Sequence, residues 1–260
     1  MILNILQLFK KKKQSQKNAN TYKLDELKFM IIKDAEDIRD FHISKVVAPV
    51  ILPPKVDLRK WCNPIRYQGG LGSCGGHGYG ACLEILRHQK GDLEYDCSEL
   101  MIYYYSRENK LEDSGIQMRD GAKAVFTYGG SLEMYWPYIE SNFAIESSWS
   151  AQFVGKFTKA SGYYRCYSIA DMKQSLANNV PVAIGMQVPH AFMNYSGGIY
   201  STTDGPSMGG HCMAVVGYDD NEKTLLLRNS WATSWGEAGY CRIDYDTFNK
   251  LVYDMWVLQI

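Results

Sequence analysis

The stretch QGGLGSCGGHGYGACLEILRHQ, residues 68–89, decides how this chain folds. It begins as a glycine-rich loop and changes at Ser73 into a run whose apolar positions recur at helical spacing: Cys82, Ile85 and Leu86. We therefore expect a helix from near Ser73 to about Gln89, with Gly91 as its stop. A cysteine, Cys74, falls on the first turn of this helix.

The position of Cys74 favours a reactive thiol. Free backbone N–H groups and the helix dipole at a helix start favour the thiolate, which is the nucleophilic form. The small residues around Cys74 leave room for a substrate to approach. Cys82, by contrast, lies mid-helix among apolar residues, which is typical of a structural cysteine.

A nucleophilic cysteine needs a base, and the base needs an orienting group. Among five histidines, His211 opens an apolar run (CMAVVGY) that we predict to be a strand. Asn229 ends the next predicted strand (TLLLRN), so a hairpin would bring its side chain to His211. Its carbonyl could accept from one ring nitrogen and leave the other for Cys74, while Trp231 shields that bond. His77 is a rival base, but one helical turn puts it beside or behind Cys74.

Gln68 lies in the loop before the cysteine. Acyl transfer builds negative charge on the oxygen of the scissile carbonyl, and preorganised donors stabilise that charge. The Gln68 amide and the Cys74 backbone N–H are candidates for two such donors.

The rest of the chain divides into a helical half and a β half. Further helices are expected over residues 98–106, 119–128 and 169–178, the last opened by a capping box at Ser168. Strands are expected over residues 181–188, 212–218, 224–228, 239–243 and 254–260. Such an order predicts an α+β protein of two lobes, and sites often form in the cleft between lobes.

Composition excludes several classes of function. Lys+Arg and Asp+Glu are both 28, so the net charge is zero and a nucleic-acid partner is not expected. The seven cysteines include no CxxC pair, which argues against a zinc ribbon, and they indicate a reducing compartment such as the cytoplasm. A metal site built from Cys74, His77, Cys82 and His88 would have poor ligand spacing. His42, His88 and His190 are expected at the surface.

The N-terminus carries an apolar run, residues 1–9, followed by Lys10 to Lys13. This order is the reverse of a secretory signal, and nine residues are too few to span a bilayer. We expect a flexible basic tail over residues 1–20, with a weak interfacial anchor as the alternative. Beyond it, residues 22–41 are predicted to be charged and partly helical, and residues 46–52 are β-prone.

Several blocks together resemble the signature blocks of the papain family of cysteine peptidases. They are Gln68-Gly69, Gly72-Ser73-Cys74, His211 with residues 215–218, and Asn229-Ser230-Trp231 with residues 235–240. Three further stretches match that family: residues 56–59, 98–100 and 192–200. The resemblance covers about residues 54 to 260.

This resemblance implies a papain-like two-lobed fold over residues 55–260, with a helical lobe of about 55–158 and a β-rich lobe of about 159–260. Cys74 and His211 would face each other across the cleft and hydrolyse a peptide or protein substrate through a thioester. No metal or organic cofactor is implied. The resemblance places four residues at the substrate: Gly115, Ile116, Gly210 and Trp231.

The chain also departs from papain itself. Gly75 stands where papain and the cathepsins carry tryptophan, and Leu71 stands where they carry a disulfide cysteine. These changes, and the stretch of residues 34–41, resemble a bacterial and archaeal branch that lacks the conventional disulfides and long propeptide. We therefore expect no disulfide that the fold needs. A catalytically inactive papain-like binding module is the alternative function.

Residues 21–54 precede the expected domain and carry many apolar side chains. Leaving them in water would be costly, so we expect this segment to pack on the domain. One face open to it is the substrate cleft, where it would restrict access to Cys74. The alternative is simple packing on the back of the β lobe.

Overall fold

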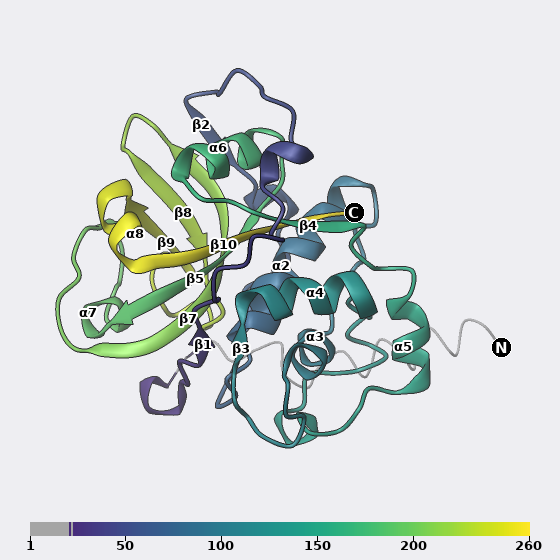
Figure 1. Ribbon diagram of the computed structural model, residues 1–260. Coiled ribbons are helices and arrows are strands. Elements are labelled where there is room, and N and C mark those ends of the chain that lie inside the picture. The colour runs from purple at the N-terminus through teal and green to yellow at the C-terminus, as the bar shows by residue number, and fades with distance from the viewer. Residues whose placement is uncertain (1–20, 22) are drawn as a thin grey trace.

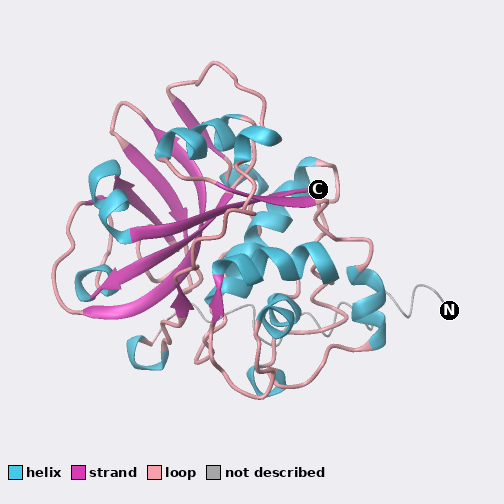
Figure 2. Cartoon of the chain, in the orientation of Figure 1, coloured by secondary structure: helices cyan, strands magenta, loops and turns pink. Residues whose placement is uncertain are grey.

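The computed structural model describes residue 21 and residues 23–260. It has a large β-sheet on one side and a group of helices on the other (Figures 1 and 2). Seven α-helices and two sheets are present in this part of the chain. The expected α+β fold is confirmed.

Helix α2 (Cys74–Gln89) is the central helix, and nearly all of its side chains are buried. It packs on α3 (Glu99–Ser106), on α4 (Met118–Tyr128) and on strand β7 of the sheet. Gly76 lets α2 approach α3 closely, because a Cβ at this position would lie 2.5 Å from the carbonyl oxygen of Glu99. The expected helices 73–89, 98–106 and 119–128 therefore form within one residue of their predicted ends.

The main sheet has eight strands in the order β4-β10-β5-β7-β8-β9-β6, with β2 also paired to β7. Its members are β2 (Lys55–Asp57), β4 (Gly162–Arg165), β5 (Val182–Pro189), β6 (Ile199–Tyr200), β7 (Ser207–Asp219), β8 (Thr224–Arg228), β9 (Tyr240–Asp244) and β10 (Val252–Gln259). The five predicted strands correspond to β5 and β7–β10. Strand β7 begins five residues earlier than predicted, because its glycine-rich start at residues 209–210 still pairs with β5.

Several short elements were not predicted. They are α5 (Trp149–Gly155), α7 (His190–Met193), α8 (Tyr245–Leu251), and the 3₁₀ turns η2 (Ile43–Lys45), η3 (Arg59–Trp61) and η4 (Glu140–Asn142). Helix α6 (Ile169–Ala177), which was predicted, begins as expected with the Ser168 hydroxyl accepting from the Asp171 N–H at 3.1 Å.

The segment before the domain differs from the sequence prediction. Residues 22–41 were expected to be partly helical, but they hold only the 3₁₀ turn η1 (Leu24–Glu26) and the short strand β1 (Ile31–Ile32). Residues 46–52 form no strand, because their backbone bonds instead to side chains of α6; the Val50 N–H donates to Gln174 Oε1 at 3.0 Å. The tail expected over residues 1–20 lies outside the described residues.

Strand β1 lies between the sheet and the helices, where it pairs in parallel with β3 (Ile116–Gln117) (Figure 1). Met30, directly before it, forms a bridge with Gly210 of β7. The segment therefore contacts both halves of the molecule. Within the described residues, no helix has the length and apolar character that crossing a membrane requires.

Candidate active site

Cys74 is the first residue of α2 and is fully buried. Burial raises the pKa of its thiol to about 11, while backbone N–H groups of Cys212, Gly75 and Met30 oppose that rise. Cys212 follows His211 directly on β7, so the start of α2 and the start of β7 meet at this thiol.

His211 is held by Asn229, which follows β8. The His211 Nε2 atom lies 2.8 Å from Asn229 Oδ1, and the Ser230 N–H donates to the same oxygen at 2.8 Å. Because that atom accepts from a backbone N–H, it is the amide oxygen, and His211 Nε2 must carry a proton. His211 Nδ1 is then unprotonated in the neutral ring, and it has no partner among the described residues. The ring is thus oriented with one nitrogen free to act as a base.

Aromatic rings enclose this pair. The Trp231 ring lies 4.7 Å from the His211 ring, centroid to centroid. Phe29 contacts both rings edge-on, at 6.0 Å from His211 and 5.7 Å from Trp231. Burial lowers the pKa of His211 to about 4, and the Asn229 bond opposes that shift. Burial therefore favours the neutral form of the His211 imidazole, as it favours the neutral form of the Cys74 thiol.

Gln68 is buried and held at both ends of its side chain. Its Oε1 accepts from the Ser230 hydroxyl at 2.8 Å, and its Nε2 donates to the Leu71 carbonyl at 3.2 Å. The backbone N–H of Gln68 donates to the Ser230 carbonyl at 3.0 Å. Gln68 is therefore fixed to the same Asn229–Ser230 turn that orients His211.

The four residues expected at the substrate all contact residues 29–31. The Ile116 N–H donates to the Met30 carbonyl at 3.3 Å, and a Cβ at Gly115 would lie 1.9 Å from that oxygen. A Cβ at Gly210 would lie 2.0 Å from the Ile31 carbonyl oxygen. Together with the Phe29–Trp231 contact, these approaches put the segment on the candidate substrate surface.

Gly75 has a structural reason to lack a side chain. A Cβ there would lie 2.2 Å from Ile116 Cδ1 and 3.4 Å from Ile31 Cδ1. The space beside Cys74, at the position where papain is expected to carry tryptophan, is filled here by two isoleucines, one of them from the N-terminal segment.

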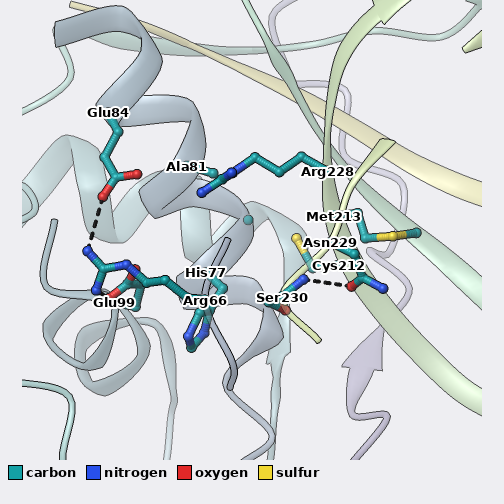
Figure 3. A pocket seen from close by; sticks show the side chains of 11 residues that line it. Arg66, His77, Ala81, Glu84, Glu99, Cys212, Met213, Arg228, Asn229 and Ser230 are labelled. Atoms are coloured by element: carbon teal, nitrogen blue, oxygen red, sulfur yellow. Dashed lines mark hydrogen bonds and ion pairs between the residues drawn. The ribbon is translucent and has the colours of Figure 1, made fainter. Parts of the chain in front are cut away.

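A small polar cavity adjoins the candidate site at Asn229 (Figure 3). Its volume is about 10 Å³, room for a single water, and Asn229 and Ser230 form part of its lining. Arg66, from the loop before α2, pairs with Glu99 at 2.8 Å and Glu84 at 3.4 Å in this region. These buried charges tie the loop that carries Gln68 onto α2 and α3.

The remaining histidines lie outside the site or behind it. His77 is buried, with Nδ1 on the Ser73 carbonyl at 3.1 Å, and burial lowers its pKa to about 3. His88 was expected at the surface, but it is buried because its ring nitrogens bond to the carbonyls of Trp61 and Tyr95. No group of three metal-ligating side chains occurs among residues 21 and 23–260.

Sequence reasoning did not single out Phe29, Met30 or Ser230. The apolar run at residues 29–32 marked that stretch for burial, but burial alone does not choose a face. Ser230 was visible only as the residue after Asn229, and its bond to Gln68 joins residues 162 positions apart.

The chain is similar in sequence to known cysteine proteases. The family model described as "Papain family cysteine protease" matches residues 52–257. An uncharacterized peptidase C1-like protein of Acanthamoeba polyphaga mimivirus is 30% identical over 91% of this chain and 84% of its own length. Cysteine proteinase 3 of Entamoeba histolytica is 31% identical over 76% of this chain, and the match spans 64% of that protein.

Solved structures give the same result. Xylellain, a cysteine protease from Xylella fastidiosa, superposes with a TM-score of 0.78 at 28% identity, over 95% of this chain and 98% of that one. The Carica candamarcensis cysteine protease CMS1MS2, solved in complex with E-64, superposes with a TM-score of 0.66 at 28% identity, over 80% of this chain and 99% of that one.

Proposed function

This chain belongs to the papain family of cysteine proteases, and we propose that it hydrolyses peptide bonds through Cys74, His211, Asn229 and Gln68. One observation carries the proposal. Asn229 Oδ1 accepts from both His211 Nε2 and the Ser230 N–H, which leaves His211 Nδ1 without a partner among the described residues. The backbone N–H of Cys212, the residue after His211, bonds to the Cys74 thiol. An oriented base beside a nucleophile at a helix start is the arrangement that acyl transfer requires.

The reaction follows from these roles. His211 Nδ1 takes the Cys74 proton, and the thiolate attacks the carbonyl carbon of the scissile peptide bond. The Cys74 backbone N–H and the Gln68 amide, turned from Leu71, stabilise the resulting oxyanion. The imidazolium gives its proton to the leaving amine, and a thioester remains. Water, activated by His211, then releases the acid and restores the thiol.

The proposal includes a cover over the cleft, made of residues 29–32. Support comes from the Phe29 contacts with His211 and Trp231 and from the Met30 backbone contacts with Ile116 and Gly210. A peptide or protein substrate would need the same surface. Substrate and cover therefore compete, and hydrolysis requires the segment to move away from Cys74.

The test of the reaction uses the full-length chain and its Ile31→Arg variant with a mixture of fluorogenic peptides. We expect hydrolysis that Cys74→Ala abolishes and a single peptidyl-epoxide adduct at Cys74 by mass spectrometry. Absence of hydrolysis, together with equal labelling of all seven cysteines, would mean a binding module instead of an enzyme.

The test of the cover compares Ile31→Arg with Ile51→Arg. Ile31 is 6% exposed and Ile51 is 98% exposed, although both belong to the N-terminal segment. Losing about 1.5–3 kcal/mol of burial at Ile31 shifts the equilibrium towards the open cleft by roughly ten- to a hundredfold. We expect Ile31→Arg to hydrolyse peptides faster by up to that factor and Ile51→Arg to match the parent. Equal rates in all three proteins would make the segment purely structural.

A further inference from the structure

Tyr138 lies between α4 and η4, and its hydroxyl reaches two residues next to the proposed reaction centre. The Tyr138 hydroxyl donates to the Gln68 backbone carbonyl at 2.6 Å and lies 2.5 Å from the Ser73 hydroxyl. All three residues are buried. Gln68 is the proposed side-chain donor of the oxyanion hole, and Ser73 directly precedes Cys74, whose N–H is the other donor.

The direction of these hydrogen bonds is fixed. A backbone carbonyl only accepts, so the single Tyr138 proton goes to Gln68. The Tyr138 oxygen must then accept from the Ser73 hydroxyl. The result is a chain that runs from the Ser73 hydroxyl through the Tyr138 hydroxyl to the Gln68 carbonyl, and each bond in such a chain polarises the next.

The Ser73 hydroxyl bonds to Tyr138 instead of capping helix α2. Ser73 is the N-cap residue of α2, where a serine hydroxyl commonly accepts from a backbone N–H of the first turn and contributes about 1 kcal/mol. No such capping bond forms at Ser73, whereas Ser98, Ser148 and Ser168 all cap their helices in this way. The Ser73 carbonyl is also held, since it lies 3.1 Å from His77 Nδ1.

We propose that Tyr138 is a positioning residue that holds the two donors of the oxyanion hole in a fixed relation through one hydroxyl group. The inference rests on the proposed function, because it concerns the donors assigned there. A donor must be aimed at the developing charge before the reaction begins, and displacement by a fraction of an ångström weakens that effect. Tyr138 joins the backbone of Gln68 to the side chain of Ser73, the residue directly before Cys74.

The alternative is that Tyr138 only fills the core. Its ring packs with Leu71 and Leu100 and meets the His77 ring edge-on at 4.9 Å. Tyr138→Phe keeps that ring and removes only the hydroxyl. Tyr95→Phe is the matched control, because Tyr95 is also buried and its hydroxyl also donates to a backbone carbonyl, that of Gly130, outside the candidate site.

The experiment separates the oxyanion hole from the nucleophile, in the full-length chain with and without Ile31→Arg. Peptide hydrolysis and inhibition by a peptide aldehyde both place a charged oxygen in the hole. Alkylation of Cys74 by iodoacetamide needs the thiolate but no such oxygen. For Tyr138→Phe we expect kcat to fall and the aldehyde inhibition constant to rise, each by roughly tenfold, which is less than the loss of a whole donor. KM and the pH profile of alkylation should stay unchanged.

Three results would overturn the inference. Tyr138→Phe could match Tyr95→Phe in kcat and aldehyde binding, in which case the hydroxyl only stabilises the fold. Hydrolysis and alkylation could fall together, which would place the effect on the thiol. If the parent proteins hydrolyse no peptide and Cys74 reacts no faster than other cysteines, the proposed function itself fails; hydrolysis by the parent alongside an unaffected Tyr138→Phe variant refutes only the role of Tyr138.

Discussion

At the Cys74 thiol, burial and hydrogen bonding act in opposite directions. Burial is the larger effect and raises the pKa to about 11, while backbone N–H groups at the helix start favour the thiolate. Met30, which belongs to the N-terminal segment, supplies a further backbone N–H group and so lies against the sulfur. Moving that segment would return water to the sulfur and leave the N–H groups of α2 in place.

This balance predicts a pH dependence. A raised thiol pKa means that the thiolate appears only at high pH, so the covered protein should react with iodoacetamide slowly below about pH 10. In Ile31→Arg the burial effect weakens and the pKa falls, so the reactivity of Cys74 should extend to neutral pH. The measurement is the alkylation rate at Cys74 between pH 5 and 11. Superimposable profiles for the two proteins would show that the segment does not control the thiol.

The role proposed for Gln68 predicts a different kinetic effect, since Gln68 would stabilise the oxyanion and not the thiolate. Gln68→Ala should lower kcat by roughly ten- to a thousandfold, the usual cost of one oxyanion donor, and leave Cys74 alkylation intact. Gln152→Ala is the control, because Gln152 Nε2 also donates to a backbone carbonyl, that of Ser147, at 2.7 Å, but on α5. Undiminished turnover in Gln68→Ala would reduce Gln68 to a loop residue.

Among the elements, those with a periodic pattern were predictable and the N-terminal segment was not. Helix α2 and strand β8 have apolar spacing that specifies their type from local sequence. Residues 23–41 carry helix-forming residues, yet they form only one 3₁₀ turn and no α-helix, because tertiary bonds hold them instead. Asp34 accepts from the Arg119 N–H at 3.0 Å and from Trp256 Nε1 at 2.8 Å, partners 85 and 222 positions away. No local pattern encodes such contacts.

Asp34 and Asp40 anchor this segment to both halves of the molecule. Asp40 pairs with Arg119 of α4 at 2.7 Å and with Arg165 of β4 at 3.2 Å. Asp34 is 4% exposed, and its backbone N–H donates to Asp254 of β10 at 2.8 Å. Deleting residues 21–54 would leave Arg119, Arg165 and Asp254 without these partners. Point variants therefore test the role of the segment with less damage to the fold than a truncation would cause.

Asp34→Ala should therefore release the segment and weaken the fold together. Removing one partner of a buried charged cluster costs about 3–5 kcal/mol, so we expect the Tm to fall by roughly 10 °C and peptide hydrolysis to rise. Thermal unfolding and hydrolysis rates measure the two effects. Asp37→Ala is the control on the same segment, because the ion pair of Asp37 is with its near neighbour in sequence, the exposed Arg39, at 2.5 Å. An Asp34→Ala protein with the parent's Tm and rate would contradict the anchoring role.

For the whole molecule, the family and a set of candidate site residues could be predicted from the sequence, whereas the surroundings of those residues could not. Cys74, His211, Asn229 and Gln68 stand in recognisable blocks, and the family they resemble is the one the chain belongs to. Two of their neighbours lie in no such block: Phe29, whose ring contacts His211, and Met30, whose backbone N–H bonds to Cys74. The buried hydrogen bonds that link Ser73 to Gln68 through Tyr138 likewise form only in the folded protein, so the sequence did not reveal them.

The last prediction concerns what holds this molecule together. All seven cysteines are free, and six of them are buried, in agreement with the expectation of a fold without disulfides. A chain of 260 residues buries enough apolar surface to be stable without covalent links. The core supports this reading, since one hydrophobic cluster extends from Leu27 through α2 to Leu258 of β10.

We therefore expect the same Tm with and without a thiol reductant. Thiol titration of the unreduced protein in denaturant should find seven reactive groups. In native buffer the partly exposed Cys62 should react quickly, and Cys74 should react before the other five because movement of the N-terminal segment exposes it. The buried thiols need local opening before a reagent can reach them. A Tm that falls on reduction, or fewer than seven thiols in denaturant, would mean that two cysteines pair in the protein as it is made, and the stability of the fold would then depend on oxidation.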